Sequence, residues 1–148
     1  MKSIDVQQVQ EALQQWLSHD VYLHLEKTNG AYAALHSDNA IPVGAYIRNG
    51  LVSIERATIK GLGPYRVGLK MQLGWIYAEG LTDFEIDEQG RLLLSGNDSE
   101  GRLMVALELS ETPFPVWPVP WILFKRGLIR WNDMFLFFFP TLMMKRSP

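Results

Sequence analysis

The chain of 148 residues contains no cysteine. This absence excludes disulfide bonds, cysteine nucleophiles and cysteine-ligated zinc sites, and it is compatible with a reducing cytosolic compartment. Histidine is also scarce: there are three, and none has the HxH or HxxxH spacing that is typical of metal sites. A metal-dependent reaction centre therefore has few candidate nitrogen ligands and no thiolate ligand in this sequence.

An excess of positive charge is missing as well. Residues 1–114 carry nine basic and fifteen acidic side chains, a net charge of −6, whereas residues 115–148 carry five basic side chains and one acidic side chain, a net charge of +4. An acidic body without a basic stripe disfavours nucleic acid as a partner. The polar start of the chain, MKSIDVQQVQ, lacks the apolar segment of a secretory signal.

No apolar run approaches the roughly 20 residues that a membrane-spanning helix needs. The longest, Met134 to Met144, is interrupted by Pro140 and Thr141 and belongs to a segment, residues 115–148, that is rich in proline, aromatic and basic residues. Three interpretations stay open for this segment. It packs on the body or on a partner subunit, it lies in a membrane interface, or it is an aberrant C-terminal end that does not fold. We favour packing or disorder over membrane contact.

Residues 3–17 form the clearest helical pattern, because apolar residues recur at helical spacing and Ser3 is a plausible N-cap. After this helix the apolar period changes to two, and about eight or nine short strands follow at regular spacing. Length and apolar content suit one ordinary globular domain. We predict a mainly β (α+β) fold for residues 1–114, in which the N-terminal helix packs on an antiparallel β-barrel or sandwich.

Two kinds of turn punctuate the strands. The Asn-Gly pairs at 29–30 and 49–50 predict tight hairpin turns, since both residue types tolerate positive φ. The hexapeptide pattern Asp-x-x-Gly-Arg-Leu occurs at 87–92 and again at 98–103. A calcium loop would need acidic residues alternating over about twelve positions, so we interpret both repeats as turns that are opened by aspartate and closed by glycine.

The stretch VYLHLE places a histidine and a carboxylate on one side of a strand. His24 and Glu26 are two residues apart, so their side chains share a face about 6.5 Å apart along the chain. With His36 or another carboxylate they would supply a metal site. The simpler interpretation, which we prefer, is a half-exposed strand whose polar face contains them without a function.

Basic residues on other strands offer a possible anion site. Arg48, Arg66 and Lys70 are expected on polar strand faces, where they could bind a phosphate or a carboxylate together with the loop at 61–66. No helix follows that loop, so it is not a nucleotide-binding loop. The candidate ligand contacts are therefore His24, Glu26, Arg48 and Arg66. No nucleophile–base arrangement stands out, and we predict no catalytic residue, no metal ligand and no cofactor.

Several long stretches resemble one family. DVYLHLEKTNGAYAA, GAYIRN, GPYRVGLK, GWIYAEGLTDFEIDEQGRLLLSG and EGRLMVALELSETPF are similar to the YojF-like family of small bacterial proteins, a group of unknown function found in bacilli. The similarity covers residues 1 to about 114. Members of the family typically stop soon after the ETPF stretch, so residues 115–148 depart from its pattern.

The resemblance implies a compact, mostly β, cytoplasmic protein without an established activity. Family genes tend to lie beside a gene for a zinc-dependent deacetylase of bacillithiol synthesis, which implies an accessory role. Three hypotheses follow: a non-catalytic accessory or binding protein, alone or as a homodimer; a β-barrel protein that binds a small anionic ligand; and, least favoured, a metal-dependent hydrolase built on His24 and Glu26.

Overall fold

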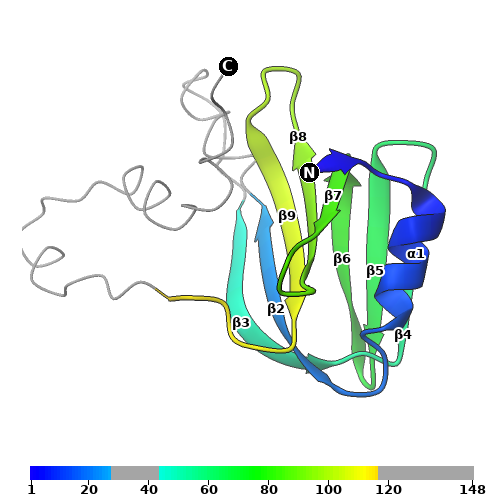
Figure 1. The fold of residues 1–148 in the computed structure, drawn as a ribbon, viewed down its shortest axis with the longest axis vertical. Coiled ribbons are helices and arrows are strands. Elements are labelled where there is room, and N and C mark those ends of the chain that lie inside the picture. Colours follow the sequence, from blue (N-terminus) through cyan, green and yellow to red (C-terminus); the bar gives the residue numbers. More distant parts are fainter. Residues whose placement is uncertain (28–43, 117–148) are drawn as a thin grey trace, which may run out of the picture. The chain divides into compact units, whose positions relative to one another are not determined.

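Residues 1–27 and 44–116 are described by the computed structural model of the protein (Figure 1). Met1–Phe114 form one compact unit. The described elements, in chain order, are β1 (Lys2–Ser3), α1 (Val6–Gln14), β2 (Asp20–Lys27), β3 (Ala45–Ser53), β4 (Arg56–Lys60), β5 (Tyr65–Met71), β6 (Gly74–Leu81), β7 (Asp83–Ile86), β8 (Leu92–Asn97) and β9 (Leu103–Ser110).

The strands form two antiparallel sheets. One has six strands in the order β1-β7-β8-β9-β2-β3, and the other has three in the order β4-β5-β6. The prediction of a mainly β, antiparallel fold with one N-terminal helix is confirmed. The closed barrel is not found within the described residues, where the strands make two separate sheets.

Both sheets contribute to a single hydrophobic core, which also takes the buried face of α1. Alternation of side chains along each strand places every second residue on this core face. The largest fully buried apolar residues come from the helix, from both sheets and from the β3–β4 connection: Leu13, Leu23, Ile54, Leu69, Leu81, Phe84, Leu92, Leu94, Leu107 and Leu109.

The two sheets come into close backbone contact where β8 meets the end of β6. A Cβ placed on Gly96 of β8 would overlap the carbonyl oxygen of Gly80 of β6 and would lie 2.7 Å from Cγ1 of Val105. Gly80 itself has a φ of 90°, a conformation that favours glycine. Glycine at 96 therefore lets the two backbones pass directly against each other, and glycine at 80 accommodates the positive φ.

Helix α1 lies beside β4 (Figure 1). Its N-cap is Asp5, whose carboxylate accepts a hydrogen bond from the backbone N–H of Gln8 at 3.0 Å. The helix is thus shorter than the predicted 3–17, and the prediction of Ser3 as N-cap is wrong because Ser3 pairs with β7 instead. Gln10 donates to the carbonyl of Ala57 and accepts from the N–H of Ile59, so the helix satisfies the backbone at the outer edge of β4.

The two repeated turns are confirmed. Asp87 and Asp98 each accept, through Oδ1, hydrogen bonds from the backbone N–H groups two and four residues later. Each also binds the arginine that closes its repeat, at 2.6 Å and 2.7 Å. The glycines at 90 and 101 have φ of 75° and 76°, as the turn interpretation requires.

The Asn-Gly pair at 49–50 does not form a hairpin turn, so that prediction is wrong. Both residues lie inside β3, which continues from Ala45 to Ser53. Asn49 does take a positive φ, 56°, but it does so beside a shift in register of the β2–β3 pair between Leu23 and Leu25. The same conformational freedom that makes a turn makes a β-bulge here.

Several predictions fall outside the described residues. These are the hairpin turn at 29–30, the candidate ligand His36 and the three interpretations of the C-terminal segment beyond Val116. Along residues 1–27 and 44–116, no helix is long and apolar enough to cross a bilayer.

Candidate functional site

Three of the four candidate ligand contacts lie together on the face of the six-stranded sheet that is turned away from the core. His24 and Glu26 are on β2, and Arg48 is on the neighbouring strand β3. Glu108 of β9 stands directly opposite His24 in the β2–β9 ladder. We call His24, Glu26, Arg48 and Glu108 the buried polar cluster.

The interpretation of this face as half-exposed is wrong. His24 is 0% exposed, Glu26 1% and Glu108 8%. Nε2 of His24 lies 3.6 Å from Oε2 of Glu26, and Nη1 of Arg48 lies 3.6 Å from Oε2 of Glu108. Each carboxylate thus has a cationic or cation-forming neighbour, which partly offsets the cost of taking it out of water.

Phe114 packs on this cluster from the end of the compact unit. Its ring lies 6.3 Å from the His24 ring, and the guanidinium groups of Arg48 and Arg91 stand over it at 4.9 Å and 5.8 Å. Two hydrogen bonds fix the backbone of Phe114: the Asn49 side chain donates to its carbonyl at 3.0 Å and accepts from its N–H at 2.7 Å. The bulge residue Asn49 therefore positions the aromatic ring that covers the cluster.

Burial dominates the electrostatics of the cluster. It raises the pKa of Glu108 above the usual 4.5, although His24, Arg48 and Arg91 act to lower it. Burial also raises the pKa of Tyr46, whose ring meets His24 edge-on at 5.4 Å. A raised carboxyl pKa occurs in general acids, but it equally marks a buried structural carboxyl.

The burial of the cluster restricts the reactions that its side chains could take part in. Both carboxylate oxygens of Glu26 are buried and have no hydrogen-bond partner in the part of the chain that the structure describes. Within that part no group of three or more histidine or acidic residues is arranged to hold a metal ion. Among the residues that the structure describes, the cluster thus combines imidazole, carboxylate and guanidinium groups that could bind a ligand, but its histidine and carboxylates are buried.

Arg66 is not brought to this cluster. It lies on β5 of the three-stranded sheet, where its guanidinium pairs with Glu79 at 2.6 Å and both side chains are more than half exposed. The sequence could not separate it from Arg48, because both arginines occupy polar positions of alternating strands.

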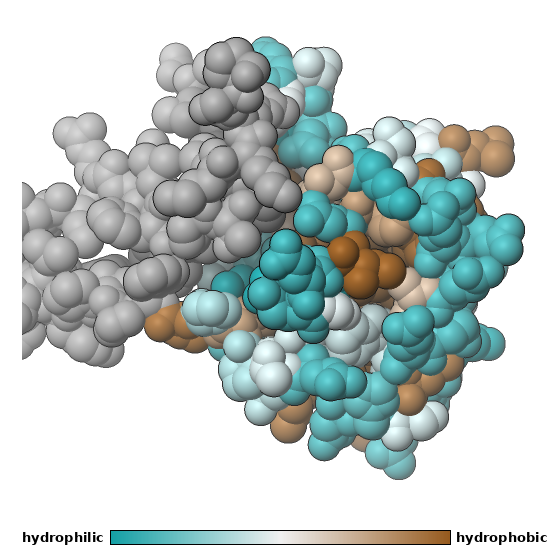
Figure 2. Space-filling view, in the orientation of Figure 1, coloured by the Kyte–Doolittle hydropathy of each residue, from teal (hydrophilic) through white to brown (hydrophobic). Residues whose placement is uncertain are grey.

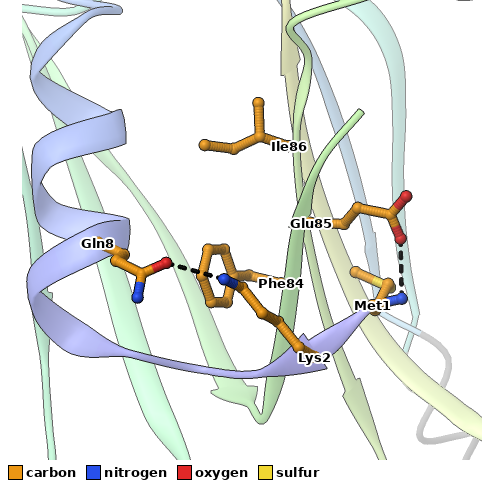
Figure 3. A pocket seen from close by; sticks show the side chains of 6 residues that line it. All are labelled: Met1, Lys2, Gln8, Phe84, Glu85 and Ile86. Atoms are coloured by element: carbon orange, nitrogen blue, oxygen red, sulfur yellow. Dashed lines mark hydrogen bonds and ion pairs between the residues drawn. The ribbon is translucent and has the colours of Figure 1, made fainter. Parts of the chain in front are cut away.

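A shallow hollow of about 340 Å³ lies elsewhere, beside β1 and β7 (Figure 3). Lys2 donates a hydrogen bond to Gln8 across it, and the N-terminal ammonium of Met1 binds Glu85 at 2.8 Å. Figure 2 shows a mostly hydrophilic surface with a compact hydrophobic patch near the middle of this view. None of the candidate ligand contacts lines this hollow, so it gives them no route to solvent.

Sequence reasoning missed two residues of the site, Glu108 and Phe114. Glu108 had a usable signal, because it is the single charged residue in the otherwise apolar strand Leu103–Ser110. A lone carboxylate in such a strand must be buried with a partner or face outward. Phe114 had no local signal, since its contacts with Asn49 join residues 65 positions apart.

The raised pKa of Glu108 predicts a pH-dependent effect of Glu108→Gln. A carboxyl whose folded pKa is raised contributes stability that is complete below its unfolded pKa and is lost as the pH rises through the folded value. Glutamine resembles the protonated carboxyl and removes this loss. As the pH rises above the usual carboxyl pKa and through the raised pKa of Glu108, urea unfolding should therefore show the variant gaining stability relative to the wild type. The exposed Glu88→Gln serves as the control, and a flat difference for Glu108→Gln would contradict the prediction.

Comparison with known proteins agrees with the resemblance seen in the sequence. Residues 3–114 match the family described as "Protein of unknown function (DUF1806)". The chain is 49% identical over 116 residues to the uncharacterized protein YojF of Bacillus subtilis (strain 168). The aligned residues make up 78% of this chain and 100% of that protein. The crystal structure of Bacillus subtilis YojF is similar with a TM-score of 0.65 and 47% identity, covering 78% of this chain and 97% of that one. The chain therefore belongs to this YojF-like family of proteins of unknown function.

Proposed function

We propose that this protein acts by binding another protein and catalyses no reaction of its own. The closure of the buried polar cluster carries the proposal. A reaction centre must admit its substrate to the reacting groups, yet His24 and Glu26 are fully buried and Phe114 packs over the histidine ring. The best candidates for chemistry are thus better explained as internal supports of the sheet.

The partner that we propose is the zinc-dependent deacetylase whose gene tends to accompany genes of this family. The exposed surface of the compact unit is compatible with protein binding. Strand β3 is an edge strand among the described residues, and it exposes large apolar side chains at Tyr46, Ile47 and Leu51. Exposed apolar residues at a sheet edge are a common basis for protein contacts, including contacts between two copies of one chain.

Co-expression tests this proposal directly. The tagged protein is expressed with the deacetylase encoded beside its gene, and deacetylase activity is measured with and without the purified partner. We expect a complex that survives gel filtration and a change in deacetylase activity on addition of the partner. The protein alone should show no hydrolase activity with or without added zinc. Absence of both a complex and an effect on activity would overturn the accessory role.

Binding of a small anion is a second candidate with weaker support. Arg48 is the one arginine among the sequence candidates that lies at the cluster, and it stands beside Glu108. Two carboxylates, Glu26 and Glu108, would repel an anion placed there. A thermal shift with phosphate and with thiol-sugar precursors distinguishes the two proposals. A rise in melting temperature that saturates with ligand concentration would favour the anion site.

A further inference from the structure

The outer face of the three-stranded sheet is rich in cationic and aromatic side chains. The core-facing residues of β4, β5 and β6 alternate with outward-facing ones, and the ladder pairs Arg56 with Lys70 and Lys70 with Trp75. The next outward-facing position of β5, Gly68, pairs with Tyr77 of β6. The one after it, Arg66, pairs with Lys60 of β4. We call this surface the basic aromatic face; its cationic and aromatic members are Arg56, Lys60, Arg66, Lys70, Trp75 and Tyr77.

The two aromatic rings at its centre are ordered and accessible. Trp75 and Tyr77 stack with ring centroids 5.6 Å apart and planes within 6°. They lean over Gly68, where a Cβ would come within 2.9 Å of the Tyr77 ring. The guanidinium groups of Arg56 and Arg66 stand over the Trp75 and Tyr77 rings. Even so, Trp75 is 40% exposed and Tyr77 51%, so this ordered platform leaves much aromatic surface in contact with water.

The charge of the face is opposite to that of the unit that carries it. The face holds four cations, and two carboxylates, Glu55 and Glu79, reach it, although residues 1–114 have a net charge of −6. Arg66 binds Glu79 and Lys70 binds Glu55. Arg56 and Lys60 make no ion pair with the described residues. These two cations are therefore available to a partner at the moment of contact.

Apolar side chains project from both ends of the same sheet. Leu62 in the β4–β5 turn and Leu73 in the β5–β6 turn are 102% and 96% exposed, so both side chains lie in solvent. Tryptophan, tyrosine and arginine are the residues that most often dominate protein interfaces, and apolar anchors at the margin add buried area. Two free leucines beside a cationic aromatic centre suit a protein surface better than a sugar–phosphate chain.

We propose that the basic aromatic face docks an acidic surface of a different protein. The proposal rests on the binding role proposed above and deepens it, because it places the partner contact on this face rather than at the edge of β3 and states the partner's charge. A second copy of this chain in a two-fold arrangement would set Arg56 and Lys60 against cations of the same face. A nucleic acid would be repelled by the strongly acidic unit around the face.

Two synthetic peptides test the proposal without knowledge of the partner. They share the same leucine and phenylalanine positions, and one carries aspartate and glutamate where the other carries asparagine and glutamine. Titrations of the full chain are followed by the indole N–H resonance of Trp75, which is assigned with Trp75→Phe. We expect the acidic peptide to shift this resonance and the amides of β4, β5 and β6, with at least about tenfold tighter binding than its neutral counterpart at low salt. Equal binding of the two peptides, shifts outside these strands, or no binding would overturn the proposal.

Substitutions on and off the face supply the matched comparison. Lys60→Glu should weaken binding of the acidic peptide at least about fivefold and Trp75→Ala about tenfold. Lys2→Glu makes the same charge change on β1 of the other sheet and should leave binding unchanged. Preferential binding of oligothymidylate, or peptide-free shifts that grow with protein concentration, would overturn the proposal in favour of nucleic acid or self-association.

Binding of the deacetylase to the variants of the face tests this inference independently of the accessory role on which it rests. A complex with the deacetylase that survives both Lys60→Glu and Trp75→Ala would overturn the docking face and leave the accessory role intact. Binding of the acidic peptide without any deacetylase complex would overturn the accessory role and leave the docking face intact.

Discussion

Gly96→Ala should destabilise the protein by about 3 kcal/mol, the upper end of the usual cost of overpacking a core. The added methyl group would overlap the carbonyl oxygen of Gly80 and crowd Cγ1 of Val105 at 2.7 Å. A flexible side chain could turn away from such a clash, but the Gly80 oxygen belongs to a backbone that is itself held in a left-handed conformation. The two sheets must separate locally for the methyl group to fit, and that separation loosens the core that they share.

Gly74→Ala is the matched control for this prediction. Gly74 opens β6, the same strand that contains Gly80, and the nearest atom to its added Cβ is the Met71 methyl at 4.0 Å. That variant should be neutral or slightly more stable, because alanine reduces the entropy of the unfolded chain. Urea midpoints at constant slope measure both variants. A Gly96→Ala protein within about 0.5 kcal/mol of the wild type would contradict the close approach of β8 to β6.

Local sequence chemistry predicted the repeated turns correctly because each turn is completed within its own residues. Asp87 receives the backbone N–H groups of the turn that it opens, and Arg91 closes the same turn. The helix was also recognisable, but its start was not. Asp5 and Ser3 are both good capping residues, and the pairing of Ser3 with β7 decides between them.

The error at Asn49–Gly50 has a different cause. Asparagine followed by glycine predicts a positive φ, and Asn49 adopts one. The sequence does not say whether the chain reverses there or continues through a bulge, since both use the same backbone conformation. The outcome depends on β2, which pairs with β3 on both sides of the irregularity.

The sequence predicted that His24 and Glu26 lie side by side but not what surrounds them. Alternation correctly placed His24 and Glu26 on one side of β2, since side-chain direction has a strict period of two. Alternation cannot report what covers that side. The local pattern also does not show which sheet a strand joins. Arg48 and Arg66 therefore looked equivalent in the sequence, although the structure puts them in different sheets.

Phe114→Ala should cost about 3–5 kcal/mol, the usual range for removing a buried phenylalanine ring. The ring is 3% exposed and packs against His24, Arg48 and Arg91. Its loss would open the buried polar cluster to water, so the variant should also lose the pH-dependent difference that Glu108→Gln produces in the wild type. Val116→Ala is the control: Val116 is 61% exposed, and the change should remain within about 0.5 kcal/mol.

Phe114→Leu separates the two contributions of the ring. Leucine keeps most of the apolar volume and should cost only about 1–1.5 kcal/mol through packing, but it offers no aromatic face to the two arginines. Because the cation–π contact with the arginines is also lost, the free energy of unfolding of the leucine variant should fall by more than this packing cost. The additional loss should not depend on salt concentration, because the interacting groups are mostly buried. A Phe114→Ala protein as stable as the wild type would show that Asn49 and Phe114 do not close this face of the sheet.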